Sequence, residues 1–250
     1  MKNQLYNYVL RLGDNALIMG HRLGEWCSKA PILEEDLALT NFALDYIGRA
    51  ELLLNYAAEI DGTGKSEDDL AYKRKERDFY NHLITELPNG NFADTMAKQF
   101  LFSSYEFLFY TKLLNSKDER LAAIAQKAIK EIKYHLKHAS DWVIKLGDGT
   151  HESHYKMQKA INDCWMYTGE LFEMDTTDEA MCDLQIGVNS SLLNSEWQLM
   201  ALEVLNAANI NIPSDSYMQT GSKKGIHTEH LGYILADMQY LPRAYPEANW

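Results

Sequence analysis

The sequence has little proline, glycine or cysteine, and each shortage excludes a class of protein. Only 5 prolines and 14 glycines occur among 250 residues, too few for collagen, for a β-sandwich with many turns or for long flexible linkers. Three cysteines without a C-x-x-C spacing are too few for a disulfide framework. With 46% apolar and 24% charged residues, the chain is also too apolar to be intrinsically disordered.

Positive charge is scarce as well. Lysine and arginine together number 24 against 36 acidic residues, which gives a net charge of −12. No run of basic residues is longer than those at 73–75 and 223–224. This balance disfavours nucleic acid and anionic membranes as partners and favours a cationic or locally basic protein partner.

Targeting segments and long apolar runs are missing too. The first residues lack the basic region and apolar stretch of a signal peptide. No window approaches the roughly 20 apolar residues needed to span a bilayer. We therefore expect a cytoplasmic chain with neither a nucleic-acid nor a membrane partner.

Apolar residues at helical spacing are abundant. Steps of three and four predict long helices over residues 5–26, 33–60, 93–114 and 118–147. Further helices are predicted at 72–87, 155–172, 178–184, 192–208 and 227–241, with loops at 61–69 and 209–225. No stretch alternates with period two, so no sheet is expected. The pattern predicts an all-α fold: an antiparallel four-helix bundle with additional C-terminal helices, in a single domain over residues 1–250.

Large helical bundles often hold two iron ions through Glu-x-x-His pairs, because residues three apart share a helix face. In this sequence no glutamate is followed three residues later by histidine. The one Asp-x-x-His, Asp148 to His151, lies in a predicted turn. Asp14 and His21 share a face of the first helix, but they are seven residues apart. A full di-iron ligand set is therefore not encoded.

Fragments of such a set remain on three predicted helices. Asp45 has Gly48 at the position where a second ligand would be needed, Glu106 lies in the third long helix, and Glu131 and His135 are four apart in the fourth. Our hypothesis is that Asp45, Glu106, Glu131 and His135 form a degenerate metal-site network that holds the bundle in one register, with His135 as the internal partner. Solvated or locally paired carboxylates are the ordinary alternative, and a bound metal is another.

A glycine-bounded basic loop, residues 221–225, precedes the last predicted helix. Its cations and backbone amides could contact an anion or a partner, and it lacks the Walker pattern. The candidate contact residues are Lys223, Lys224, His227, Glu229 and His230. The last three could also bind a metal, although such a grouping is common by chance. No nucleophile elbow or Rossmann glycine motif occurs.

Several longer segments carry a resemblance to a known family: Leu10-Arg-Leu-Gly-Asp-Asn15, Arg22-Leu-Gly-Glu-Trp26, Asp36-Leu-Ala-Leu39, Pro88-Asn-Gly-Asn-Phe-Ala-Asp-Thr95, Lys127-Ala-Ile-Lys-Glu131 with Tyr134-His-Leu136, and Gly221-Ser-Lys-Lys-Gly-Ile-His-Thr-Glu-His-Leu-Gly232. Together they resemble the C subunits (PaaC type) of bacterial 1,2-phenylacetyl-CoA epoxidases. The resemblance extends over nearly the whole chain, from residue 10 to residue 241.

This resemblance implies a ferritin-like, cytosolic subunit of a multicomponent monooxygenase in aerobic phenylacetate degradation. In that family the complex uses molecular oxygen to form the ring-1,2-epoxide of phenylacetyl-CoA, and a reductase delivers electrons from NADPH. The di-iron site belongs to the A subunit, while the C subunit has lost its metal and pairs with A to keep it folded. The resemblance supplies no catalytic residue. We therefore expect no cofactor in this chain, and the A subunit, the small B subunit and the reductase as partners.

Two further possibilities stay open. The chain could be a free-standing carboxylate-bridged di-iron oxidase or a ferritin-like iron-binding protein, although the missing Glu-x-x-His pair argues against both. Independently of the resemblance, Lys223 and Lys224 could lie near the partner's opening and help to hold the anionic CoA group. A related oxygenase acting on another aryl-CoA thioester would have a very similar subunit.

Overall fold

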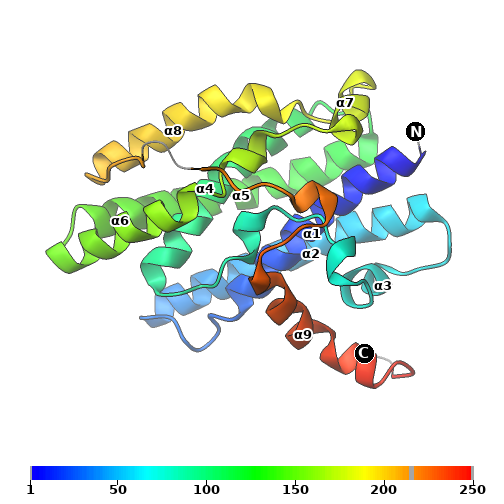
Figure 1. Cartoon of the computed structure of the whole chain (residues 1–250), viewed down its shortest axis with the longest axis horizontal. Helices are drawn as coiled ribbons and strands as arrows, with labels where there is room; N and C mark the ends of the chain where they lie inside the picture. The colour runs from blue at the N-terminus through cyan, green and yellow to red at the C-terminus, as the bar shows by residue number, and fades with distance from the viewer. Residues whose placement is uncertain (1, 214–216, 249–250) are drawn as a thin grey trace. The chain divides into compact units, whose positions relative to one another are not determined.

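The computed structural model describes residues 2–213 and 217–248, and these residues form helices joined by turns, with no strand among them (Figure 1). The all-α prediction is confirmed. Within the described ranges, no helix combines the length and the apolar character needed to cross a membrane. The chain divides into two compact units, Met1–Leu87 with Gly221–Trp250, and Pro88–Thr220. We call them the first and the second unit, and the single domain over 1–250 stays a prediction.

The first unit is built on a helical hairpin. Helices α1 (Lys2–Gly24) and α2 (Leu33–Asp61) lie side by side (Figure 1). The unit also contains α3 (Glu67–Tyr72), α9 (Glu229–Ala244) and short 3₁₀ turns at Glu76–Asp78, Leu83–Glu86 and Ser222–Lys224. The apolar seam predicted for the first helix is buried at Val9, Leu12, Ala16, Met19 and Leu23. Burial of this seam is what stabilises α1 against α2.

The second unit contains the other long hairpin, formed by α4 (Phe92–Leu113) and α5 (Glu119–Gly147). Its remaining elements are α6 (His151–Trp165), α7 (Thr176–Asp183), α8 (Asn194–Ala207) and 3₁₀ turns at Gly169–Phe172 and Ser190–Leu193. Helices α6 and α8 pack against the hairpin. A side chain caps the start of each of these two long helices. Asn91 accepts from the Ala93 amide at 2.8 Å, and Asp118 accepts from the Leu121 amide at 2.9 Å.

Large aromatic side chains fill the interior of the second unit. The Trp197 ring centroid lies 5.6 Å from that of Trp165 and 5.3 Å from that of Phe172. The indole N–H of Trp197 donates to the Leu101 carbonyl at 3.1 Å, so its one polar group is satisfied. These rings form part of the core of the second unit.

The predicted loop at 61–69 and helix at 72–87 are wrong. Ser66 instead caps the short helix α3 by accepting from the Asp69 amide at 3.2 Å, and the segment after it is mostly irregular. Its backbone amides bond to side chains of α1: the Tyr80 N–H donates to Asp14 at 3.0 Å and the His82 N–H donates to Asn15 at 2.7 Å. Tertiary partners thus replace the i−4 carbonyls that a helix would offer.

The helix predicted at 155–172 is wrong at both ends. Thr150 accepts from the Ser153 amide at 3.2 Å, so α6 begins four residues earlier, at His151. It ends at Trp165, and the remainder of the predicted segment includes a separate 3₁₀ turn.

Candidate functional site

A cluster of buried charges lies inside the first unit, beginning at Asp14 on α1. The Asp14 side chain is fully buried and forms a two-pronged ion pair with Arg74: Arg74 Nη1 donates to Oδ2 at 3.0 Å and Nη2 donates to Oδ1. The Arg74 guanidinium also stacks 4.0 Å from the ring centroid of Phe79. Burial raises the pKa of the Asp14 carboxyl, while the Arg74 charge and hydrogen bonds oppose that rise.

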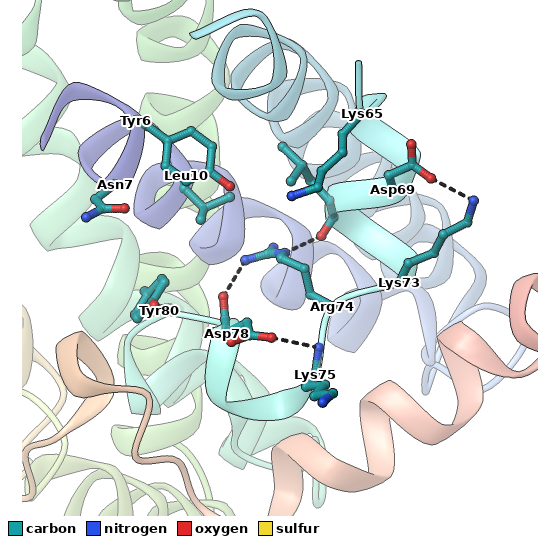
Figure 2. Close-up of a pocket in the computed structure, with 11 residues that line it drawn as sticks. Tyr6, Asn7, Leu10, Lys65, Asp69, Lys73, Arg74, Lys75, Asp78 and Tyr80 are labelled. Atoms are coloured by element: carbon teal, nitrogen blue, oxygen red, sulfur yellow. Dashed lines mark hydrogen bonds and ion pairs between the residues drawn. The ribbon is translucent and has the colours of Figure 1, made fainter. Parts of the chain in front are cut away.

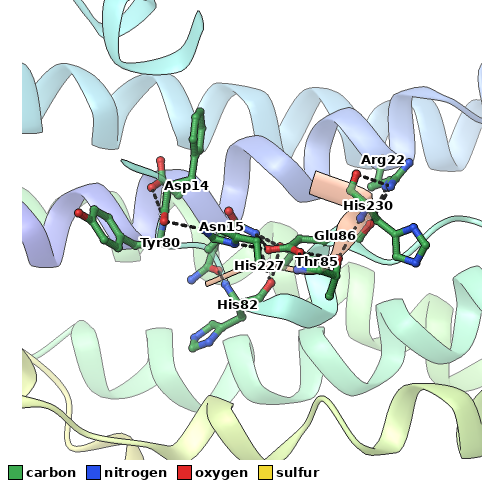
Figure 3. Close-up of polar contacts among 12 residues, drawn as sticks. Asp14, Asn15, Arg22, Tyr80, His82, Thr85, Glu86, His227 and His230 are labelled. Atoms are coloured by element: carbon green, nitrogen blue, oxygen red, sulfur yellow. Dashed lines mark hydrogen bonds and ion pairs between the residues drawn. The ribbon is translucent and has the colours of Figure 1, made fainter. Parts of the chain in front are cut away.

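Glu86 is the centre of the cluster (Figure 3). Its side chain has no exposed surface and accepts four hydrogen bonds. Oε1 accepts from Asn81 Nδ2 at 3.0 Å and from His227 Nδ1 at 2.5 Å, while Oε2 accepts from the Thr228 amide at 2.8 Å and the Thr228 hydroxyl at 2.6 Å. Four donors match the acceptor capacity of an ionised carboxylate. The residue is therefore a fully satisfied buried anion.

His227 is the cation that faces Glu86. Its Nε2 lies 2.8 Å from the Phe79 carbonyl oxygen, which can only accept, so Nε2 carries a proton. Nδ1 faces the Glu86 carboxylate, whose negative charge and hydrogen bond favour a second proton on the ring and hence an imidazolium. Burial lowers the pKa of His227, but the hydrogen bond and charge of Glu86, with the Phe79 carbonyl, raise the pKa by more.

Arg22 of α1 forms hydrogen bonds with both the Glu86 region and the start of α9. Its Nε and Nη2 donate to the Glu86 main-chain oxygen at 3.0 and 2.7 Å, and Nη2 also reaches the His230 carbonyl at 3.4 Å (Figure 3). Nη1 donates to Glu25 at 2.8 Å. Three segments distant in sequence, around residues 22, 86 and 230, are thereby held at one point.

This cluster of buried charges can stabilise the fold, but it cannot act on a substrate. The side chains of Glu86 and His227 have no exposed surface, and each of their charged atoms is bonded within the chain. A substrate has no access to either group. The charges of Asp14, Arg74, Glu86 and His227 sum to zero, which is the condition for burying them at acceptable cost.

An open pocket of about 560 Å³ is lined in part by Arg74, the partner of Asp14. Figure 2 shows the residues that line it. It is lined by Tyr6, Asn7, Leu10, Lys65, Asp69, Leu70, Lys73, Arg74, Lys75, Asp78 and Tyr80. Several of its cations have carboxylate partners within the chain: Lys73 is 2.6 Å from Asp69, and Arg74 is paired with Asp14. A ligand anion would have to compete with these carboxylates, so the pocket is not a ready-made anion site.

The four residues of the predicted degenerate network fall in different places. Glu106 and His135 are buried on the neighbouring helices α4 and α5, and Glu131 is half-buried on α5. Asp45 is half-buried on α2, in the first unit. The network itself stays a prediction.

The donor set around these residues does not fit a pair of iron ions. The residue three before His135, where a Glu-x-x-His pair needs a carboxylate, is the fully buried Ile132. The residue three after Asp45 is Gly48, which has no side chain to offer. Within residues 2–213 and 217–248, no group of three or more His, Cys, Asp or Glu side chains is placed to hold a metal ion.

The basic loop is folded tightly against the first unit. Gly225 has a φ of 66°, and a Cβ there would collide with the Arg77 carbonyl oxygen, so this position requires glycine. Lys224 is exposed and Lys223 is half-buried, while the His227 side chain is committed to Glu86. The structure thus places His227 in an internal pair, and contacts through Lys223, Lys224, Glu229 and His230 stay a prediction.

Sequence reasoning missed the centre of this cluster. Glu86, Asn81 and Arg74 lie in the segment 72–87, which was predicted to be a helix but is mostly irregular, so no spacing rule connects them to α1 or to residue 227. One signal was present: the adjacent polar residues Asp14 and Asn15 interrupt an otherwise apolar stretch of α1. Two such residues inside a buried helix require polar partners from elsewhere.

Comparison with known proteins agrees with the helical fold. The chain is 49% identical over 248 residues to a protein of Escherichia coli (strain K12) that is named as the C subunit of 1,2-phenylacetyl-CoA epoxidase, covering 99% of this chain and 100% of that protein. Residues 1–250 match the family described as phenylacetic acid catabolic protein, PaaA_PaaC. The predicted resemblance is confirmed, and the chain belongs to the phenylacetic acid catabolic protein family.

Proposed function

We propose that this chain is the C subunit of a 1,2-phenylacetyl-CoA epoxidase in phenylacetate catabolism and that it is not itself catalytic. The observation that carries the proposal is the 49% identity, end to end, with a protein named as that subunit. The donor set supports the non-catalytic part, because Ile132 stands where a Glu-x-x-His pair ending at His135 needs its glutamate. Its cofactor-free state follows from the same argument.

The proposed role is to bind and stabilise the di-iron A subunit. Any partner that binds only the folded form of a protein raises the stability of that form by mass action. The buried ion pairs of the first unit suit such a role, since they fix one conformation of the helices that would be presented to the partner. The small B subunit and the reductase would join the same cytoplasmic complex.

We also propose that Lys223 and Lys224 contact the anionic CoA group of the substrate. Their loop is held rigidly by Gly225 and by the Ile226 amide, which donates to the Gly221 carbonyl at 3.1 Å. Charge reversal of both lysines in the reconstituted complex should raise the KM for the thioester without changing the iron content. An unchanged KM would remove this role from the proposal.

The decisive experiment combines metal analysis with co-purification. The chain is produced alone and together with the A subunit from the same genome, and iron is measured in each product. We expect iron only in the preparation that contains A, and a stable complex between the two chains. About two iron ions per chain in this protein alone, with thioester oxidation, would instead identify the free-standing di-iron oxidase. Iron binding without oxidation would identify a ferritin-like iron-binding protein.

A further inference from the structure

The outer face of α2 carries an apolar stripe that the rest of its unit leaves uncovered. Leu33, Leu37 and Leu44 are 70%, 56% and 64% exposed, and Leu52 is 37% exposed. With Gly48 these positions follow one another in steps of four, seven, four and four, so they share one face of the helix. The stripe extends over about 29 Å at 1.5 Å per residue. We call these five residues the α2 stripe.

Gly48 is a second observation that points to a helix packing against the α2 stripe. Glycine in a helix interior destabilises the helix relative to alanine, so its presence there calls for a structural explanation. A Cβ at Gly48 would meet no atom of the described residues within 4 Å, apart from its own helix backbone, so packing among those residues does not explain the glycine. A glycine between exposed leucines is what allows a second helix backbone to approach closely.

The charges beside the stripe indicate the chemistry of the partner. The acidic residues of α2 are Glu34, Glu35, Asp36, Asp45, Glu51, Glu59 and Asp61. The single basic residue of the helix, Arg49, is buried. Of these acids Glu35 is buried and Asp61 is paired with Lys65, while Glu34, Glu51 and Glu59 are exposed. The exposed charges of α2 are thus acidic and complement a helix bordered by Lys or Arg.

A second copy of this chain would fit the stripe poorly. In a two-fold symmetric contact the same patch faces itself, so the acidic border of α2 would lie against an identical acidic border. Like charges placed opposite each other weaken such a contact. The same argument does not apply to a helix from a different subunit.

We propose that the α2 stripe is a docking surface for an amphipathic helix of a partner subunit, whose apolar face packs on Leu37, Leu44 and Gly48 and whose borders carry Lys or Arg. This inference rests on the proposed function and deepens it, because it assigns the contact between subunits to one face of one helix.

The first test measures binding to the co-expressed A subunit. The double variant Leu37→Glu with Leu44→Glu should weaken the complex at least about tenfold, since it places charge in an apolar contact. The matched control is Leu192→Glu with Leu199→Glu, where the leucines are 75% and 69% exposed and also seven apart. Circular dichroism and melting temperature confirm that both variants fold.

Gly48 allows a test in which two measurements move in opposite directions. Gly48→Ala should raise the melting temperature of the isolated chain, because alanine favours the helix, and should weaken the complex severalfold, because the added methyl group separates the helices. Gly232→Ala in α9, where a Cβ would meet Glu76 Oε2 at an ordinary 3.6 Å, is the control that should leave binding unchanged.

Charge reversal distinguishes the possible occupants. Glu51→Lys should weaken binding of a basic helix, and the binding of the original chain should fall as salt is raised. If the occupant were a second copy, the same variant would strengthen self-association, measured by sedimentation of the chain alone.

The binding experiments distinguish a wrong assignment of the docking surface from a wrong proposal for the function. If the original chain binds A and the leucine double variant binds equally well, the stripe is not the contact, although the function stands. Equal loss in the α2 variant and in its control would also overturn the assignment. If the original chain does not bind A at all, both proposals fall.

Discussion

The interiors of the two helical units are filled in different ways. In the second unit the centre is filled by aromatic rings around Trp197, and its polar group is bonded to a backbone carbonyl. In the first unit the interior contains ion pairs, Asp14 with Arg74 and Glu86 with His227, that connect segments distant in sequence. Apolar packing depends on shape alone, whereas buried ion pairs depend on every partner and on pH. Substitutions that remove side-chain volume should therefore destabilise the second unit most, and substitutions that remove a charge should destabilise the first unit most.

The largest effect is expected from Trp197→Ala in the second unit. The variant removes a side chain that is 2% exposed and leaves the Leu101 carbonyl without its indole donor. We expect a loss of about 4 kcal/mol in the free energy of unfolding, measured by denaturant titration. The loss should be the same at pH 6 and pH 9, and a clear pH dependence would contradict the contrast between the units.

A slightly smaller loss is expected from Glu86→Ala in the first unit. Removing this carboxylate leaves the His227 imidazolium and the Thr228 amide without an acceptor inside the protein. Breaking a buried pair in this way should cost about 3 kcal/mol at pH 7, read from the same titration. The double variant Glu86→Ala with His227→Ala should recover part of the loss, since no unpaired charge remains. No recovery would show that the pair is not coupled.

The loop that carries His227 provides the next prediction. Gly225→Ala forces an L side chain to a φ of 66° and against the Arg77 carbonyl oxygen. The expected loss is about 2 kcal/mol, since strain at such a position and steric overlap add. Gly24→Ala is the control, because a Cβ there meets no atom within 4 Å. Equal stability of the two variants would mean that the loop does not depend on this contact.

The smallest effect is a pH dependence that belongs to the first unit. The pKa of His227 is raised in the folded state, so its stabilising charge is fully present below the unfolded value of about 6.5. That stability is lost as pH rises through the folded pKa. The original chain should lose more stability than Glu86→Gln over this range, measured by thermal unfolding in matched buffers. Parallel curves would exclude the ion pair as the source.

Much of the fold was predictable because its signals are local. The apolar seams indicated the two hairpins, and the helix starts predicted at 93 and 118 lie next to the side-chain caps Asn91 and Asp118. The segment 73–86 was not predictable, because its amides bond to Asp14 and Asn15 on another helix. The same limit applies to the site, since sequence placed His227 in a candidate contact loop but could not supply Glu86 as its partner.

By itself, the sequence determined that this protein is helical and that it lacks Glu-x-x-His pairs, because spacing along the chain is enough for both. Its longer segments also carried the resemblance to the family. Only the tertiary structure decided where the buried charges are paired and that the leucines of α2 face outward beside an open glycine. The physical reason is that helix formation depends on neighbours within about four residues, whereas Coulombic pairing and burial depend on residues brought together from any distance in the sequence.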